Sequence, residues 1–548
     1  MPRMFALVMI VLVVPYWEKW DSREGVELVC VLKKKKFRFL APQNALGFVD
    51  RSTGLGVGSF SSRLSDRWRR HWRGGTTGDN RMPSLADYRR LMGDLSGLTR
   101  GILDKNVTVG FGVCAKLYQK WLRDERDGGN YELSAQESPE VVRQMRLQYK
   151  AAGLDTVATF RLDGIFGVLY LSLKHKDEAL CSKRRPVVPC FNAHDRMLQN
   201  RVGRALCFFF TQLAGHFNVA ATQEIAGGLH RFNETIEGGD TVMAAGFDVK
   251  EMYVRLKPDV VLAAAEWVVM QAMEGHDGVL VNTRGRKGVG WYEAGTPRRV
   301  VVRMTSQQIL AGVKFILDND FLFVAGDLVR QVCGIGIGGG ASPGLAQCVC
   351  VYGEMQWTTS LGADRRLGDT RVLGVRLMDD CALLVAGDCR DAGDRLQALR
   401  TVFTGYVRDC YPEGITVEQT SDGLSWIFCG MQLTVSQRGA VARLITKNVQ
   451  AGIGTGDQLA FFPFVSFYSE CGRVQKMAST LNALYRIERH STSDAQRAAA
   501  VIDMLRELKW QGYPRGWLFE ALVKMVTRAP FGFWNRLRKA LDRAGVRP

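Results

Sequence analysis

Apolar residues run in short blocks along this chain and alternate with polar, glycine-rich stretches. Short apolar or alternating runs between turn residues predict strands, and we expect them at residues 241–248, 414–418, 426–435 and 440–446. Helices are expected at 258–273, opened by a proline, at 307–317, at 392–407, and over most of the chain after residue 446. A turn-rich insert at 275–299 predicts a surface loop or hairpin. The mixture of elements indicates an α+β fold.

The first hundred residues are expected to be a basic, partly irregular extension. The apolar run 5–14 follows Arg3 and has the outline of a signal peptide. However, the run is too short to span a bilayer and no small-x-small cleavage site follows, so we interpret it as a buried strand or a spurious extension of the gene model. The basic cluster at 67–73 fits a phosphate-binding or nuclear-import patch, and equally a solvated charged face.

Composition adds a preference for polyanions. Lys and Arg number 73 against 55 Asp and Glu, which leaves a formal net charge of +18. Such an excess neutralises phosphates and releases counterions, so nucleic acid is the simplest partner, although membrane-surface proteins share this balance. The 13 cysteines include no C-x-x-C pair, which argues against a zinc site and fits a reducing compartment.

Two adjacent carboxylates, Asp379 and Asp380, interrupt the apolar run 375–386. Burying two like charges side by side is costly unless cations share the site or the turn stays wet. A divalent metal site and a plain Asp-Asp hairpin turn both fit this pattern.

A second acidic residue, Asp248, ends the expected strand 241–248, and Tyr253 follows five residues later. If the two acidic strands are neighbours, Asp248 and Asp379 could bridge a pair of Mg²⁺ ions for the in-line displacement of pyrophosphate by a 3′-hydroxyl. Tyr253 would then lie beneath the incoming sugar and exclude a 2′-hydroxyl. An ordinary core tyrosine is the alternative.

Between the acidic strands lies the glycine-rich segment 333–347. Gly334, Gly336 and Gly339 satisfy G-x-G-x-x-G, and Glu354 lies where a ribose-binding acid would be, so a dinucleotide site must be considered. However, residues 321–332 do not form the clean preceding strand that this motif requires. The better interpretation is a loop that leads through Ser342 into a helix and lets the backbone approach a base pair.

The order FDVKEMY, GIGIGGGASPGLA, RLMDD resembles palm motifs A, B and C of reverse transcriptases. Further segments extend the resemblance to Penelope-like retroelement enzymes, relatives of the telomerase catalytic subunit: LDKNVTVGFG and KHK with RPV in the fingers, WIFCGMQLTV as the primer-grip hairpin, and LNALYRIERHSTSD with LKWQGYPRGWLFEAL in the thumb. This resemblance covers about residues 99–529.

The resemblance implies a role for each matching position. Asp248, Asp379 and Asp380 are the implied catalytic metal ligands, for two Mg²⁺ ions or Mn²⁺. Nucleotide binding is implied for a second set: Lys105 and Arg185 on the triphosphate, Tyr253 at the sugar, and Gly338 and Ser342 lining the pocket.

Several positions depart from the family pattern. Leu377 replaces the usual Tyr before x-D-D, and Gly336 and Ile337 replace the usual residues of motif B. Ser172 precedes Leu173 where a Pro-Lys pair is usual, and no lysine lies between Asp380 and Lys447 to serve as a motif D acid.

The resemblance implies a right-hand polymerase, with an extension at 1–98, fingers at 99–240, a palm with an antiparallel sheet at 241–435, and a primer-grip end and helical thumb at 436–548. The expected activity is RNA-directed DNA synthesis by a nuclear retroelement enzyme. Its expected partners are an RNA template, a DNA primer, the RNA–DNA hybrid, deoxynucleoside triphosphates and a separate nuclease, with no membrane. A catalytically silent nucleic-acid-binding protein and an RNA-templated RNA polymerase are the alternatives.

Overall fold

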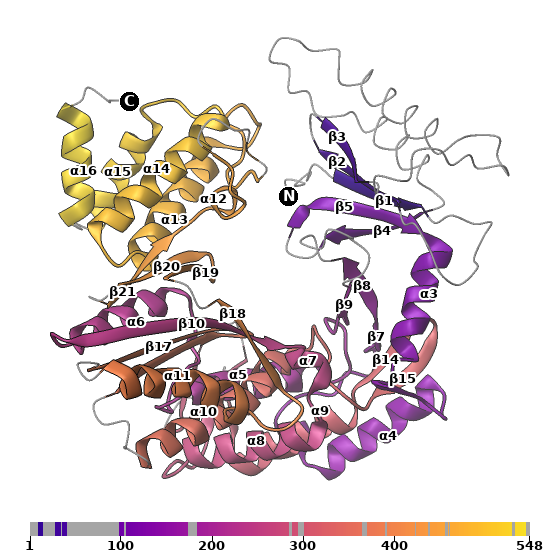
Figure 1. Ribbon diagram of the computed structural model, residues 1–548. Coiled ribbons are helices and arrows are strands. Elements are labelled where there is room, and N and C mark those ends of the chain that lie inside the picture. The colour runs from indigo at the N-terminus through magenta and orange to yellow at the C-terminus, as the bar shows by residue number, and fades with distance from the viewer. Residues whose placement is uncertain are drawn as a thin grey trace, which may run out of the picture. The chain divides into compact units, whose positions relative to one another are not determined.

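The chain folds into two compact units, each assembled from separate stretches of sequence. The first comprises residues 1–151, 159–197 and 316–340, and the second comprises 152–158, 198–315 and 341–548. Both contain sheets and helices, which confirms the α+β class (Figure 1). The computed structural model describes residues 9–14, 28–33, 36–40, 98–103, 106–173, 184–283, 288–293, 301–363, 370–388, 392–421, 424–436, 439–454, 459, 461–528 and 532–543.

The described residues of the first unit form three sheets. One has the order β3-β2-β1-β5-β4, the second β6-β15-β14-β7, and the third pairs β8 with β9. Helices α3 (Ala115–Arg126) and α4 (Ser138–Ala151) accompany them. The strands are β1 (Met9–Val14), β2 (Leu28–Lys33), β3 (Lys36–Leu40), β4 (Leu98–Leu103), β5 (Asn106–Cys114), β6 (Tyr131–Leu133), β7 (Gly167–Val168), β8 (Tyr170–Leu173), β9 (Arg184–Val187), β14 (Phe321–Val324) and β15 (Asp327–Gln331).

The described residues of the N-terminal extension form three of these strands, β1, β2 and β3. The apolar run 5–14 holds β1, which pairs in parallel with β5 and antiparallel with β2. Of the two interpretations of this run, the structure therefore shows a strand at Met9–Val14. The basic cluster at 67–73 lies outside the described residues.

The main sheet of the second unit is antiparallel and has the order β16-β17-β10-β18. Its strands are β10 (Asp240–Lys250), β16 (Arg371–Leu377), β17 (Asp380–Asp388) and β18 (Thr416–Ser421). Strand residues alternate between its faces, so Phe247 and Leu383 join one core with helix α11 (Ala392–Asp409), while Val242 and Leu384 join another with α6 (Gln223–Glu234). Figure 1 shows β10 and β17 side by side.

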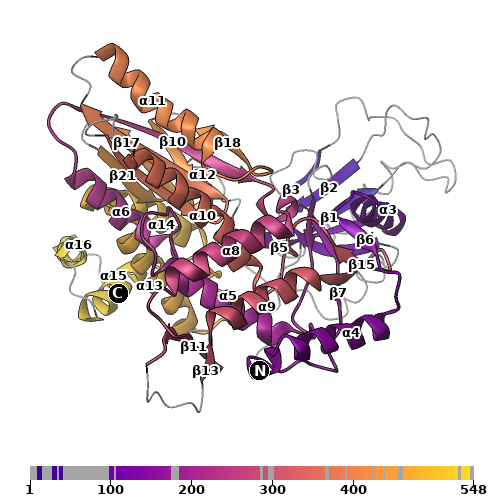
Figure 2. The ribbon, with the colours of Figure 1, turned by 90° about the horizontal axis from the view of Figure 1, so that it is seen from below.

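Long helices of the second unit follow the predicted pattern. Helix α8 (Pro258–Ala272) opens at its proline, and α10 (Ser342–Ala363) follows the glycine-rich segment. Figure 2 shows these two helices next to each other. Helix α5 (Arg196–Phe210) begins with residues of the first unit, and helix α9 (Ser306–Asp318) ends with residues of the first unit. The insert after α8 forms a small sheet of β11 (Val279–Asn282), β12 (Val289–Trp291) and β13 (Val301–Met304).

The single strand that the apolar pattern predicts at 426–435 is wrong, whereas the hairpin that the resemblance implies for WIFCGMQLTV is present, because the segment forms two strands. Strands β19 (Ser425–Phe428) and β20 (Met431–Ser436) are joined at Cys429 and Gly430, which have φ angles of 50° and 79°. Two successive residues with positive φ make the tight turn of a hairpin. Strand β21 (Gly439–Leu444) completes this sheet.

The C-terminal part is helical, as predicted. After the short helix α12 (Lys447–Gln450), a buried core that includes Trp517 and Trp534 joins the longer helices. These are α13 (Arg473–His490), α14 (Asp494–Trp510), α15 (Trp517–Arg528) and α16 (Gly532–Arg543). Within the described residues, none of the helices is long and apolar enough to cross a membrane.

Candidate active site

Asp248 and Asp380 are direct neighbours across strands β10 and β17. The Val249 amide donates to the Asp379 carbonyl oxygen at 2.9 Å, so the hydrogen bonds of this ladder flank the Asp248–Asp380 pair. The two aspartates therefore form a non-hydrogen-bonded pair, the type in which α-carbons lie about 4.5 Å apart and side chains are closest. The condition set for a shared cation site, that the two acidic strands are neighbours, is therefore met.

Asp379 lies in the tight turn that joins β16 to β17. Leu377 pairs with Asp380, so Met378 and Asp379 are the two turn residues. Met378 has a φ of 60°, a left-handed conformation that costs a non-glycine residue of order 1–3 kcal/mol and often occurs at functional sites. The Asp-Asp motif thus forms a hairpin, and that hairpin sets Asp379 and Asp380 beside Asp248.

Glu418 adds a further carboxylate beside the Asp248–Asp380 pair, and these three side chains form what we call the acidic row. Glu418 on β18 is the partner of Asp248 on its other side, so Asp380, Asp248 and Glu418 share one face of three adjacent strands. Lys250, two residues after Asp248, lies on the same face. Its Nζ atom is 2.8 Å from Asp248 Oδ2 and 2.5 Å from Glu418 Oε2, and these two carboxylates raise the pKa of Lys250.

The acidic face is partly open to solvent, whereas the opposite face is sealed. Asp380 and Glu418 are exposed and Asp248 is half-buried. Phe247 and Val249 alternate with these acids and are 2 % exposed, which anchors this end of β10 in the core. The arrangement places several carboxylates next to water on a sheet that is anchored in the core, where they can bind cations.

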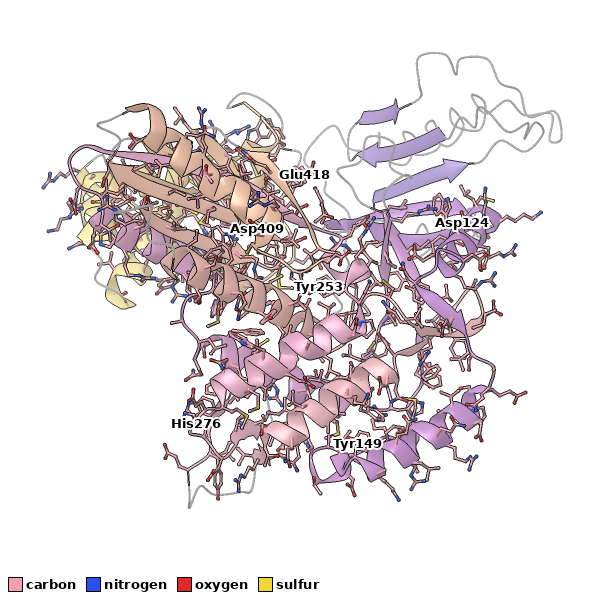
Figure 3. All side chains as sticks on the ribbon, turned by 60° about the horizontal axis from the view of Figure 1, so that its bottom comes forward. Asp124, Tyr149, Tyr253, His276, Asp409 and Glu418 are labelled. Carbon is pink, nitrogen blue, oxygen red and sulfur yellow. The ribbon has the colours of Figure 1, made fainter. Side chains whose placement is uncertain are left out.

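Tyr253 follows the end of β10 in helix α7 (Met252–Arg255). Glu251 adopts a φ of 50° between strand and helix, and Met252 is buried, with its sulfur 3.6 Å from Cys350 Sγ. Tyr253 is half-buried and lies in the same unit as the acidic row. Figure 3 labels Tyr253 and Glu418, the residues that α7 and β18 contribute.

The glycine-rich loop is bound to the strand that carries Arg185. The Val188 amide, just after β9, donates to the Ile337 carbonyl oxygen at 2.8 Å. Gly338 has a φ of 130°, and a β-carbon there would overlap the Val188 carbonyl oxygen. Arg185 and Gly338 therefore belong to one local assembly in the first unit, whereas Ser342, buried at the start of α10, belongs to the second.

The dinucleotide interpretation of the glycine-rich segment is wrong. The residues before it form a hairpin of β14 and β15, turning at Ala325 and Gly326, rather than a single strand. Glu354, the candidate ribose ligand, is fully buried in α10 and is bound by Arg376.

Lys105 lies outside the described residues, as do residues 174–183 with the KHK motif. The predicted role of Lys105 therefore stays a prediction. In the part of the chain that the structure describes, no three His, Cys, Asp or Glu side chains gather closely enough to hold a metal ion by themselves.

Four residues of this region were missed or misassigned from the sequence: Lys250, Glu418, Arg376 and Glu354. A signal existed for two of them. Lys250 lies two positions after Asp248 on a strand, which predicts a shared face, and Arg376 is a charged residue between apolar neighbours in a strand. Glu418 could be placed only by knowing which strand pairs with β10.

No protein-family model and no curated protein matches this sequence. Among solved structures, the chain is similar to telomerase from Candida albicans in complex with a TWJ fragment of telomeric RNA, at 13% identity and a TM-score of 0.45, covering 84% of this chain and 78% of that chain. Apo telomerase from Candida tropicalis gives 13% identity, a TM-score of 0.45, and coverages of 88% and 73%. The Sicinivirus 3Dpol RNA dependent RNA polymerase gives 8% identity, a TM-score of 0.36, and coverages of 73% and 74%. Similarities of this size do not assign a function.

Proposed function

We propose that this chain is an RNA-directed DNA polymerase of a Penelope-like retroelement, which extends a primer 3′-hydroxyl by nucleotidyl transfer in the nucleus. The observation that carries the proposal is the placement of Asp248 and Asp380 as adjacent cross-strand neighbours, with Asp379 in the adjoining turn. Three carboxylates at one end of a sheet whose other face is sealed suit the binding of divalent cations by hard oxygen ligands.

The residues fit Mg²⁺. Protein sites usually hold this ion by one or two carboxylates together with substrate phosphates, so a complete cage of protein ligands is not required. A positive charge already contacts the row, because Lys250 Nζ lies 2.8 Å from Asp248 Oδ2. Asp248, Asp379 and Asp380 would hold two Mg²⁺ or Mn²⁺ ions, which would activate the 3′-hydroxyl and stabilise the leaving pyrophosphate.

A second set of residues binds and orients the nucleotide. Arg185, with Lys105, holds the triphosphate, because a guanidinium forks onto phosphate oxygens. Gly338 keeps the loop beside β9 free of side-chain atoms, and Ser342 lines the pocket at the start of α10. Tyr253 excludes a 2′-hydroxyl, which selects deoxynucleotides.

Lys250 has a distinct part in this scheme. Its ammonium group neutralises Asp248 in the absence of substrate and must release that carboxylate when a metal ion binds. Glu418 offers the ammonium group a second partner at 2.5 Å, so Lys250 keeps an ion pair afterwards.

A silent nucleic-acid-binding protein is the second candidate, and the contact between Lys250 and Asp248 favours it, because a lysine that remained there would block metal binding. Primer extension on an RNA template with Mg²⁺ and deoxynucleotides, with wild type beside Asp248→Asn, separates the two. Extension that the variant loses supports the polymerase. Tight hybrid binding without extension supports the silent protein.

A further inference from the structure

A buried ion pair lies directly behind the acidic hairpin. Arg376 on β16 and Glu354 on α10 are both 0 % exposed. Arg376 Nε donates to Glu354 Oε1, and Nη2 donates to Oε2 at 3.3 Å, so the guanidinium forks onto the carboxylate. Such a pair must overcome a large desolvation cost, and an apolar pair of similar size is often at least as stable.

Glu354 is fixed by further donors. The Phe217 amide donates to Oε2 and the Tyr411 hydroxyl donates to Oε1, each at 2.9 Å. Tyr411 is in turn hydrogen-bonded to the Tyr406 hydroxyl on α11 at 2.9 Å. With donors on both oxygens, the carboxylate is a rigid base for the guanidinium of Arg376.

The third nitrogen of the Arg376 guanidinium binds the hairpin turn. Its Nη1 atom donates to the Met378 carbonyl oxygen at 3.0 Å, one residue before Asp379. Its backbone is bound as well, because its amide donates to the Phe217 carbonyl oxygen at 2.6 Å and its carbonyl accepts from the Val219 amide at 2.9 Å. The side chain thus links a fixed point in the core to the left-handed residue of the turn.

We propose that Arg376 and Glu354 are positioning residues, which hold the Met378 turn so that Asp379 and Asp380 stand beside Asp248. This inference rests on the proposed function, since it concerns the geometry of the same cation site. Only a planar guanidinium can fork onto Glu354 and also reach the Met378 carbonyl, because a lysine supplies a single point charge.

The test measures cation binding by replacing Mg²⁺ with Fe²⁺ and adding ascorbate and peroxide. Radicals formed at a bound iron ion then cut the backbone next to it. Wild type and Arg376→Lys are compared. We expect wild type to be cut next to Asp248 and Asp379, and the variant to need at least fivefold more Fe²⁺ for half-maximal cutting. Half-maximal primer extension by Arg376→Lys should likewise need at least fivefold more Mg²⁺ than extension by wild type.

Arg371→Lys is the matched control. Arg371 lies on the same strand, about 16 Å from Arg376 at strand spacing, and pairs with Glu237 and Asp240 at the far end of the sheet. It should match wild type in its Fe²⁺ dependence. Glu354→Gln is the second variant in case Arg376→Lys does not fold, because it keeps the shape but removes the charge that fixes the guanidinium, and the same shift is expected.

Two negative outcomes have different meanings. If wild type is not cut at the hairpin, or Asp379→Asn is cut like wild type, the proposed function fails and this inference fails with it. If Asp379→Asn loses cutting while Arg376→Lys and Glu354→Gln keep the wild-type Fe²⁺ dependence, the positioning role alone is overturned.

Discussion

Gly338→Ala should destabilise the glycine-rich loop more than any neighbouring glycine substitution. Gly338 has a φ of 130°, where an L-residue is strained by about 1–3 kcal/mol. The new β-carbon would also overlap the Val188 carbonyl oxygen, so the 2.8 Å hydrogen bond from Val188 to Ile337 must break, at about 1 kcal/mol. Together these effects amount to about 2–4 kcal/mol.

Two other glycines of the same unit separate the two effects. Gly326 has a φ of 100° with nothing near its β-carbon position, so Gly326→Ala reports strain alone, about 1–2 kcal/mol. Gly336 lacks a positive φ, and its β-carbon would meet Asp320 Oδ2 at an ordinary 3.4 Å. Gly336→Ala should therefore stay within about 1 kcal/mol of wild type.

Hydrogen exchange followed by mass spectrometry measures this directly, in the peptide that contains Val188. In Gly338→Ala the amide of Val188 should exchange roughly 30-fold to several-hundred-fold faster, the equivalent of the estimated energy. The Gly326→Ala and Gly336→Ala variants should leave this peptide unchanged. Wild-type exchange of the Val188 amide in Gly338→Ala would refute the close approach of loop and strand.

Four further predictions follow from individual contacts. Burial raises the pKa of Asp320 to about 6, so the contribution of the protonated carboxyl to the free energy of unfolding is lost as pH rises through 6. In denaturant unfolding, Asp320→Asn should raise the free energy of unfolding by at most about 3 kcal/mol at pH 7.5 and leave it unchanged near pH 4. Burial lowers the pKa of His490, whose ring is hydrogen-bonded to the Thr222 hydroxyl at 2.6 Å. The thermal unfolding midpoint should therefore fall as pH drops below about 6.5, and the His490→Gln variant should lose this pH dependence. Lys250→Met should lower the Mg²⁺ concentration for half-maximal extension roughly threefold, because an exposed ion pair of about 0.2–1 kcal/mol no longer competes for Asp248; an unchanged requirement would contradict that competition. Tyr253→Ala should admit ribonucleotides into a growing DNA primer, and unchanged sugar selection would remove the gate assignment.

The elements around the acidic row could be predicted because local signals agree there. The apolar run ending at Asp248, the proline that opens α8 and the glycine-rich entry to α10 each specify a boundary within a few residues. The hairpin at Asp379 follows from two carboxylates between strand-forming runs. These features depend on sequence neighbours alone.

The contacts that complete the site could not be predicted, because they join distant parts of the chain. Glu418 reaches Lys250 only through the pairing of β18 with β10, and Glu354 on α10 reaches Arg376 on β16 only through the tertiary fold. The single strand expected from the apolar pattern at 426–435 failed for a local reason, since Cys429 adopts a positive φ that the pattern does not suggest, whereas the resemblance implied the hairpin.

The most direct test of the central claim is primer extension on an RNA template with purified protein, Mg²⁺ and deoxynucleotides. Wild type, Asp248→Asn and Asp379→Asn are compared, with Arg371→Lys as a control of the same sheet and hybrid binding measured for all. The account predicts extension by wild type and Arg371→Lys, and a loss of at least a hundredfold in both aspartate variants with hybrid binding intact. Extension that survives either aspartate substitution would contradict it.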